Sequence, residues 1–220
     1  MAIMPNGLTL ADLVERFGAI PAARIRFDPP PGCATEQDVV TLEARENRLF
    51  ELVDGVLVEK AMGFYESFLA MRLVQFLLTF VEQHALGIVA GEAGMLRLAP
   101  GRVRIPDVSF VSWDRLPQRR VPRQPIPDLV PDLAVEVLSE GNTRREMEQK
   151  LQEYFTAGVR LVWYVDPVLQ EVHVYTAPDQ REVLTADHTL HGGEVLPGFT
   201  LLVRQLFAEP TESPDHHQTP

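Results

Sequence analysis

The sequence predicts an α/β fold in which short apolar strands alternate with helices along one main domain. Three features support this prediction. The turn-forming dipeptide Asp54-Gly55 separates two apolar runs, residues 133–138 are almost wholly apolar at strand length, and a helix signature begins soon afterwards at Thr143. With 220 residues, of which 45% are hydrophobic, the chain can fill one sizeable core.

The N-terminal region is expected to form a helix followed by an arm. An amphipathic pattern predicts a helix from about Ala11 to Phe17. Three consecutive prolines, Pro29 to Pro31, then exclude a helix or a strand. The organisation that we expect is a helix and arm over residues 1–45, a main domain over 46–207 and a disordered polar tail over 208–220.

The first half of the main domain predicts a hairpin, a helix and two strands. Asp54-Gly55 favours a tight turn between antiparallel strands. Residues 66–84 carry apolar side chains at helical spacing on most sides, so we expect a largely buried helix there. Strands are expected at 88–98 and at 105–111.

The second half predicts a strand, a helix and two further strands. Residues 133–138 form the first strand, and the capping-box pair Thr143 and Glu146 marks the start of a helix that continues to about Ala157. Gly158 supplies the C-terminal stop of this helix. The two further strands are expected in the segments VRLVWYVD and EVHVYT.

The charge of the chain limits its partners. A net charge of −11 argues against a protein that coats nucleic acid non-specifically, because such binding requires a cationic surface. A local basic groove stays open, because arginines cluster in three places, and a solvated loop or helix face is the alternative interpretation of each cluster. The clusters are Arg119, Arg120 and Arg123; Arg102 and Arg104; and Arg144 and Arg145.

The sequence also predicts a cytoplasmic location. The segment MAIMPNGLTL lacks the basic and apolar stretches of a signal peptide. Cys33 is the only cysteine, which excludes an internal disulfide or a cysteine-rich zinc site and suits a reducing compartment. The apolar segment 68–81 is short and contains Arg72 and Gln75, so no membrane partner is expected.

Glu136 is the first candidate for a functional residue. It shares its side of the predicted strand with Ala134 and Leu138, because alternate residues of a strand face the same side. An ionised carboxylate in apolar surroundings needs a cation, a metal ion or hydrogen-bond donors. Both a structural ion pair and a functional acid satisfy this requirement.

Lys150 is the expected partner of Glu136. It lies three residues after Met147 and four before Tyr154, so it projects from the packed flank of its helix and can face the sheet. The chain has only two lysines, Lys60 and Lys150, although it is rich in arginine. Lysine can shift its pKa or hand over a proton, which favours a chemical role, and chance placement is the alternative.

Asp107 is the second candidate acid. It follows Pro106 at the entry to an apolar strand and would lie beside Glu136 if the two strands are neighbours. Two carboxylates and a lysine make a site for a hard cation such as Mg²⁺ or Mn²⁺, which binds phosphate-bearing substrates. The lysine can then orient water or stabilise charge in the transition state.

The order of these residues resembles a known family. Asp107, then Glu136, then a lysine is similar to the pattern of the PD-(D/E)-X-K nuclease superfamily. Over roughly residues 8–207 the chain closely resembles the Uma-two family of restriction endonucleases. The segments that carry this resemblance are FELVDGVLVE, RIPDVSFV, PDLAVEVLSEGNT, KLQEYFTAGVRLVWYVDP, VHVY and VLPGFTLLVRQLF. This resemblance implies a restriction-endonuclease-like core with a mixed central sheet flanked by helices, a divalent ion held by Asp107 and Glu136, and hydrolysis of phosphodiester bonds.

The chain departs from the superfamily pattern in two places. The lysine ordinarily lies two residues after the glutamate, where this chain has Leu138, and Lys150 matches the position where the Uma-two family carries it. A further acid often comes from the first core helix, where Glu66 fits best, with Glu51 in the preceding hairpin as its rival. The family often has a histidine near the position of Glu66.

The leading hypothesis from the sequence is a Mg²⁺- or Mn²⁺-dependent endonuclease that cleaves DNA. The DNA would bind in a local basic groove, and the enzyme could act as a homodimer. Asp107 and Glu136 bind the metal ion, Lys150 positions water or stabilises charge, and Glu66 assists. The alternative is a binding or assembly module that keeps the fold and uses the charged residues as a structural ion-pair network. Hydrolysis of another phosphoester shares the same site and is the third interpretation.

Overall fold

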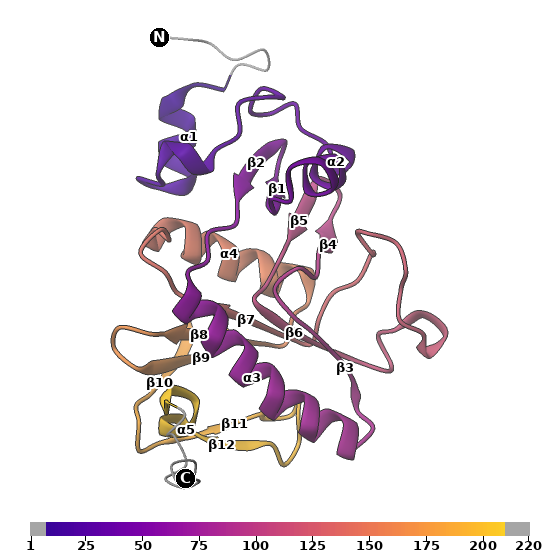
Figure 1. The fold of residues 1–220 in the computed structure, drawn as a ribbon, viewed down its shortest axis with the longest axis vertical. Coiled ribbons are helices and arrows are strands. Elements are labelled where there is room, and N and C mark those ends of the chain that lie inside the picture. Colours follow the sequence, from indigo (N-terminus) through magenta and orange to yellow (C-terminus); the bar gives the residue numbers. More distant parts are fainter. Residues whose placement is uncertain (1–7, 210–220) are drawn as a thin grey trace, which may run out of the picture.

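The protein contains two main β-sheets with helices packed around them, as a computed structural model that describes residues 8–209 shows (Figure 1). The larger sheet has the strand order β10-β9-β8-β7-β6-β3, and the smaller has the order β2-β1-β5-β4. In the larger sheet β7 and β8 pair in parallel, whereas the other neighbours pair antiparallel. The predicted fold class, a mixed central sheet flanked by helices, is therefore confirmed.

The bounds of the elements are as follows. The helices are α1 (Leu10–Phe17), α2 (Glu36–Glu46), α3 (Phe64–Gln83), α4 (Arg144–Ala157) and α5 (Val203–Phe207), with the 3₁₀ turns η1 (Ala22–Arg24) and η2 (Pro117–Arg119). The strands are β1 (Phe50–Val53), β2 (Val56–Glu59), β3 (Gly87–Ala90), β4 (Leu96–Ala99), β5 (Arg102–Arg104), β6 (Val108–Ser112), β7 (Leu133–Val137), β8 (Leu161–Asp166), β9 (Glu171–Ala177), β10 (Gln180–Leu184), β11 (Thr189–His191) and β12 (Thr200–Leu202).

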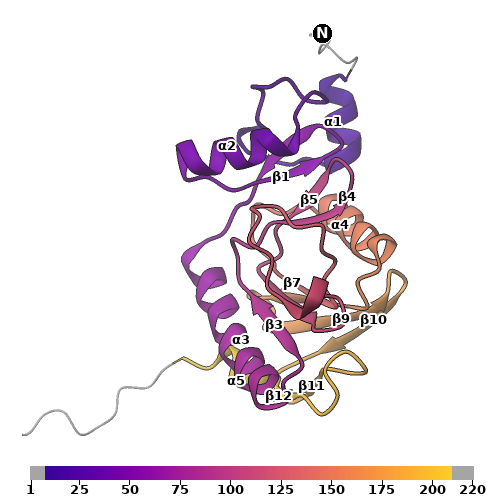
Figure 2. The ribbon, with the colours of Figure 1, turned by 90° about the vertical axis from the view of Figure 1, so that its right-hand side faces the viewer.

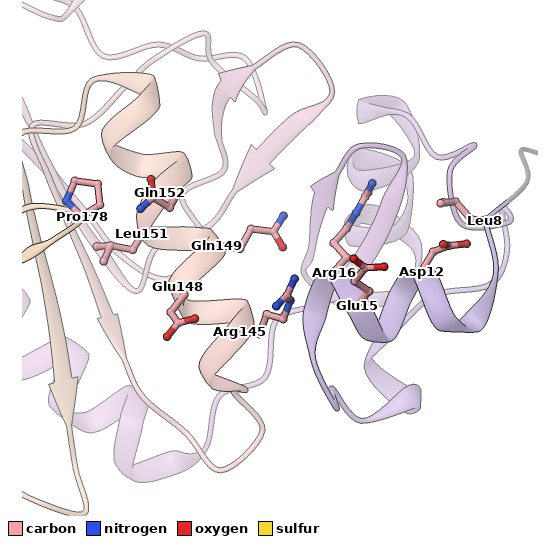
Figure 3. A pocket seen from close by; sticks show the side chains of 10 residues that line it. All are labelled: Leu8, Asp12, Glu15, Arg16, Arg145, Glu148, Gln149, Leu151, Gln152 and Pro178. Carbon is pink, nitrogen blue, oxygen red and sulfur yellow. The ribbon is translucent and has the colours of Figure 1, made fainter.

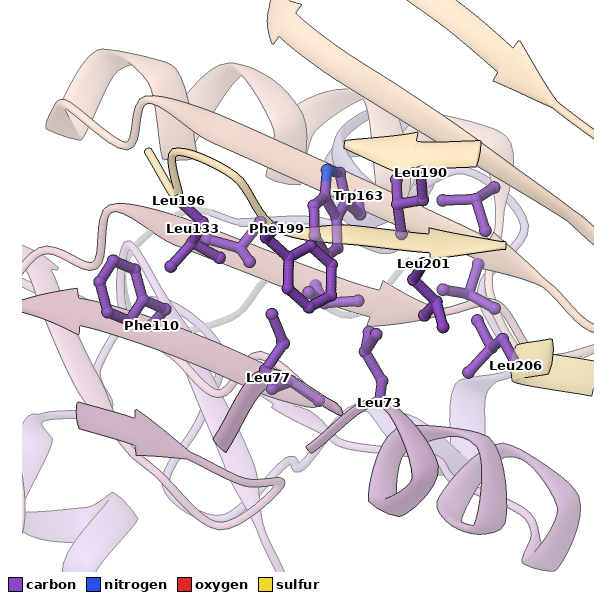
Figure 4. Close-up of a cluster of buried hydrophobic side chains, with 14 of the residues drawn as sticks. Leu73, Leu77, Phe110, Leu133, Trp163, Leu190, Leu196, Phe199, Leu201 and Leu206 are labelled. Carbon is purple, nitrogen blue, oxygen red and sulfur yellow. The ribbon is translucent and has the colours of Figure 1, made fainter. Parts of the chain in front are cut away.

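The six-stranded sheet separates two apolar cores, because alternate residues of its strands face opposite sides. On one side Leu133 and Trp163 pack with Leu73 and Leu77 of α3 and with the β11-β12 hairpin (Figure 4). On the other side Ala134 packs among the apolar residues of α4. Strand β7 therefore carries side chains into both cores, and the alternation turns Glu136 toward α4.

The four-stranded sheet is built on the predicted hairpin. Asp54 and Gly55 both have positive φ, of 47° and 78°, as the tight turn between β1 and β2 requires. A side chain at position 55 would lie 2.6 Å from the backbone of Gly32, so glycine is needed there for close approach as well. Figure 2 shows α1 and α2 beside this sheet, at the end of the molecule away from the β11-β12 hairpin.

The prediction of one strand over 88–98 is wrong. The turn at Gly91–Gly94 divides this segment into β3 and β4, which belong to different sheets. The strand expected at 105–111 is β6, which begins only at Val108, and the short strand β5 before it was not predicted. Glycines at the turn and Pro106 between β5 and β6 account for both breaks.

Two further elements differ from the prediction. The expected arm contains the helix α2, whose Val39 and Leu42 are buried against β1 and β5. Helix α3 is less buried than predicted, because Met71 and Leu78 on its outer side are 58% and 37% exposed. By length and composition α3 is also apolar enough to cross a membrane. Its inner side, however, packs in the core that it shares with the six-stranded sheet, the β11-β12 hairpin and α5.

The expected division into an arm over 1–45, a domain over 46–207 and a tail over 208–220 stays a prediction. The boundary at residue 45 falls within α2, which packs on the four-stranded sheet. All of the proposed tail beyond residue 209 lies outside the described residues.

Candidate active site

Asp107 and Glu136 come from neighbouring antiparallel strands. The pairing of β6 with β7 ends at Val108 opposite Val135, and Asp107 and Glu136 are the next residues of the two segments. The backbone N–H of Asp107 donates to the Val135 carbonyl at 2.9 Å, and that of Val137 donates to Asp107 Oδ2 at 2.6 Å. The negative charge of Asp107 raises the pKa of Glu136, so the two carboxylates lie close enough to interact.

Helix α4 brings two donors to Glu136. Lys150 Nζ lies 3.0 Å from Glu136 Oε2, and the Tyr154 hydroxyl donates to Glu136 Oε1. The two donors are one helical turn apart, so they lie on the same face of α4. All three side chains are buried. The structure thus brings together Asp107, Glu136 and Lys150, and their catalytic roles stay a prediction.

Glu51 of β1 joins this group from the other sheet. Its Oε1 lies 3.1 Å from Lys150 Nζ and accepts the Ile105 N–H at 3.0 Å, while its Oε2 lies 2.7 Å from Arg104 Nη1. Arg104 also pairs with Glu153 of α4 at 2.6 Å. Arg104 is only 1% exposed, so neither reading of the Arg102 and Arg104 cluster, a solvated face or a basic groove, holds for it.

Lys60, which follows β2, also belongs to the site. Its Nζ lies 2.8 Å from Asp107 Oδ1, and it donates to the carbonyls of Ile105 at 2.8 Å and Glu92 at 3.0 Å. Both lysines of the chain therefore pair with the acids of one cluster. The scarcity of lysine in this arginine-rich chain was the one sequence signal that could have pointed to Lys60.

Burial and neighbouring charges separate the pKa values of the two glutamates. Burial raises the pKa of Glu136 to about 7; Lys150 opposes the increase, and the negative charges of Asp107 and Glu51 add to it. Burial would also raise the pKa of Glu51, but Lys150, Arg104 and the Ile105 N–H together lower it to about 2. Glu51 is therefore ionised at neutral pH, whereas Glu136 exchanges a proton near pH 7.

The donors from α4 keep defined protonation states. Burial would lower the pKa of Lys150, but the carboxylates of Glu136 and Glu51 hold it above the ordinary value, so the side chain is an ammonium ion. Burial together with Glu136 and Glu51 raises the pKa of the Tyr154 hydroxyl well above its ordinary range, so Tyr154 stays a neutral donor.

Glu66 lies in the first turn of α3, on the wall of a groove, and not within the cluster. Across residues 8–209 no hydrogen bond or ion pair joins it to Asp107, Glu136 or Lys150. The rival acid, Glu51, is the one that contacts Lys150. In the sequence Tyr154 marked only the packed flank of its helix, and the contact of its hydroxyl with Glu136 was not predicted.

The chemical type of the oxygen donors at this site suits a divalent cation. Asp107 and Glu136 supply hard carboxylate oxygens from adjacent strands, as Mg²⁺ prefers. Within the described part of the chain, however, no three His, Cys, Asp or Glu side chains are arranged to hold an ion. Ammonium groups, the Tyr154 hydroxyl and the Val137 N–H already occupy the carboxylate oxygens. A divalent ion fits here if it takes the place of an ammonium group.

Two grooves flank the cluster. One, of about 460 Å³, is lined by Lys60 together with Arg48, Phe64 and Glu92. The other, of about 1150 Å³, is lined by Glu66, by the residues after β7 and β8 and by the first turn of α4. Met62 and Gly63 line both grooves, so the grooves adjoin. A third groove lies between α1 and α4 (Figure 3). Of the cluster's acids and lysines, Lys60 alone lines one of these three grooves, the smaller one.

Comparison with known proteins gives similar solved structures and a family. No curated protein sequence matches this chain significantly. A solved structure, titled as a putative nuclease belonging to DUF820 from Anabaena variabilis, is similar to this chain, with a TM-score of 0.64 and 21% sequence identity. The match covers 72% of this chain and 89% of the solved chain, and it supports the fold. The Uma2 family model, described as "Putative restriction endonuclease", matches residues 36–204. Because this match spans well over half of the chain, the protein belongs to the Uma2 family.

Proposed function

We propose that the protein is a divalent-metal-dependent endonuclease that hydrolyses phosphodiester bonds in DNA. The observation that carries this proposal is the convergence of Asp107, at the entry to β6, with Glu136 of the neighbouring strand β7, and with Lys150 Nζ 3.0 Å from Glu136. Family membership supports the same chemistry, because restriction endonucleases of this fold generally use divalent ions.

Asp107 and Glu136 would hold the ion. When bound, Mg²⁺ or Mn²⁺ would polarise a phosphoryl oxygen and lower the pKa of a bound water. Lys150 keeps its positive charge, so it can orient the attacking water or stabilise negative charge on the phosphoryl group. Tyr154 fixes one oxygen of Glu136 and thereby limits how that carboxylate can turn.

Glu51 is the additional acid in this proposal, in place of Glu66. It lines neither groove, but its Oε1 lies 3.1 Å from Lys150 Nζ and accepts the Ile105 N–H. These contacts position the ammonium group between two carboxylates. Glu51 therefore acts as a positioning residue for Lys150.

DNA would approach through the adjoining grooves and the exposed arginines near them. Arg48 lines the smaller groove, and Arg144 and Arg181 line the larger one. A protein with a net charge of −11 has to rely on such local positive charge to approach a polyanion. The exposed arginines Arg119, Arg120 and Arg123 form the other available basic surface.

Cleavage assays test the proposal. Wild-type protein is expected to cut plasmid or linear DNA with Mg²⁺ or Mn²⁺, and Asp107→Asn and Lys150→Met are expected to lose on the order of 100-fold or more of that activity. Glu82→Gln, on the exposed side of α3 and away from both grooves, is the matched control and should keep it. Wild-type protein that cleaves neither DNA nor RNA with either ion would refute the proposal.

A binding or assembly module is the second candidate, and one observation favours it. The oxygens of Asp107 and Glu136 already have partners without any metal ion, as a structural ion-pair network would require. Titration with Mn²⁺ separates the two functions. An enzyme should bind Mn²⁺ in a manner that Asp107→Asn abolishes, whereas a structural network should bind none specifically and should only lose stability in that variant.

A further inference from the structure

The ammonium group of Lys60 occupies a cation position made entirely of oxygen atoms. Its three acceptors are Asp107 Oδ1 at 2.8 Å, the Ile105 carbonyl at 2.8 Å and the Glu92 carbonyl at 3.0 Å. An ammonium group has three N–H donors, so Lys60 is fully satisfied there. One carboxylate and two backbone carbonyls are also the kind of oxygen ligands that hard divalent cations accept.

Lys60 controls the oxygen of Asp107 that a metal ion would need. The other oxygen, Oδ2, accepts the Val137 N–H at 2.6 Å as part of the junction between β6 and β7. Oδ1, which this backbone hydrogen bond does not use, is the oxygen that Lys60 holds. An ion at Oδ1 would lie next to the Lys60 ammonium, and the two positive charges would repel each other strongly in this buried place.

The side chain of Lys60 has a path away from Asp107. Although it is only 7% exposed, it lines the smaller groove beside Met62, Phe64 and Ser67. The side chain of Lys60 therefore extends from the wall of the groove to the acid cluster. By contrast, Lys150 is enclosed between Glu136 and Glu51 and lines neither of the grooves that flank the cluster.

We propose that Lys60 is a resident cation that neutralises Asp107 in the metal-free protein, and that a divalent ion binds by displacing its ammonium group into the groove. This inference rests on the proposed metal-dependent function. It makes Lys60 a determinant of metal affinity and leaves Lys150 as the lysine that remains in the cluster.

Calorimetric titration of the full-length protein with Mn²⁺ tests the competition. Lys60→Met removes the competing charge, so its Mn²⁺ affinity should exceed that of wild type by roughly tenfold or more, because no energy is spent in moving the ammonium. Without metal, Lys60→Met should melt at a lower temperature than wild type, and Mn²⁺ should restore its stability. Arg48→Met makes the same charge change in the same groove without contacting Asp107, so its affinity should stay close to that of wild type.

Chemical labelling of wild-type protein tests the displacement without any substitution. The chain has only two lysines, so mass spectrometry can follow acylation of each one by an amine-reactive ester. Lys60 should react slowly in the metal-free protein and several-fold faster with saturating Mn²⁺, while Lys150 stays protected in both. Labelling of Lys60 that does not change with saturating Mn²⁺ would overturn the displacement.

The outcomes distinguish this inference from the proposed function. Asp107-dependent Mn²⁺ binding of equal affinity in wild type and Lys60→Met would leave the metal site standing and refute the role of Lys60. Absence of Mn²⁺ binding in both proteins would refute the metal site itself, and the inference with it. Should Lys60→Met fail to fold, the labelling of wild-type protein decides alone.

Discussion

Glu136 predicts an unusual dependence of stability on pH. Its pKa in the folded protein is about 7, above its ordinary value of 4.5, so between these values the folded state binds more protons than the unfolded state. The free energy of unfolding contributed by Glu136 is therefore largest below pH 4.5 and is lost as the pH rises through 7. Relative to Glu136→Gln, wild type should lose stability across this interval in chemical denaturation.

The titration of Glu51 does not interfere with this prediction. Its pKa is lowered to about 2, so its own contribution is lost only as the pH falls from 4.5 toward 2, outside the interval for Glu136. A difference between wild type and Glu136→Gln that stays constant from about pH 5 to about pH 8 would show that Glu136 titrates normally.

Arg104 should be the most costly cation to remove for stability. Its guanidinium is fully buried between Glu51 and Glu153, so Arg104→Met leaves two buried carboxylates without that partner. The free energy of unfolding should fall by about 3 to 5 kcal/mol. Urea denaturation measures the loss, and Arg144→Met, which removes an exposed pair with Glu148, should change the midpoint little. Equal midpoints for the two variants would contradict this.

The two lysines show how far single residues could be predicted from the sequence. Helical spacing placed Lys150 toward Glu136, because both lie on regular elements close in the chain. Lys60 was not placed, because it lies in an irregular segment after β2 and its partner Asp107 belongs to the other sheet. Periodicity specifies the direction of a side chain on its own element, but not which distant element it meets.

At the scale of elements, local signals predicted well wherever they were strong. The hairpin at Asp54-Gly55 and helix α4, with Thr143 as its N-cap and Gly158 in the left-handed region, formed as predicted. Helix α2 was missed, although Thr35 and Asp38 form a capping box, because its apolar side chains are few. The break between β3 and β4 was missed because apolar residues continue on both sides of it. That break brings the Glu92 carbonyl to Lys60.

The N-cap of α4 also ties α1 to the main domain. The Thr143 hydroxyl accepts the Glu146 N–H at 3.0 Å and donates to the Phe17 carbonyl at 2.5 Å. Thr143→Val should therefore cost about 1 kcal/mol and increase amide hydrogen exchange both in the first turn of α4 and in α1. Thr9→Val, which removes the N-cap of α1, should increase exchange in α1 alone. Unchanged exchange of α1 in Thr143→Val would disprove the coupling.

At the scale of the whole molecule, the site exists only because the two sheets meet. Glu51 and Arg104 come from the four-stranded sheet, Asp107 and Glu136 from strands of the six-stranded sheet or their entry, and Lys150 from α4. The strands and the acids on them could be predicted from the sequence. The order of the strands in the two sheets could not, because contacts between residues far apart in the chain determine that order.

The arginines of the loop after β6 make the proposed DNA contact testable. Arg119, Arg120 and Arg123 are exposed, and the base of their loop is fixed where Arg115 pairs with Asp132 at 2.8 Å. Replacement of all three by alanine should weaken DNA binding and reduce its salt dependence by up to about three phosphate contacts. Fluorescence anisotropy at several salt concentrations measures both. Arg204→Ala, on α5, is the control, and equal salt slopes for wild type and the triple variant would exclude this loop.

The parallel pairing of β7 and β8 across α4 has a consequence for the order of folding. Glu136, Lys150 and Tyr154 lie within this single strand–helix–strand segment, so little chain entropy is lost in closing the loops between them. Glu51 and Lys60 must join across much longer stretches of chain. We expect the glutamate, lysine and tyrosine to meet early on the folding route, with the remaining charges completing the cluster near its end.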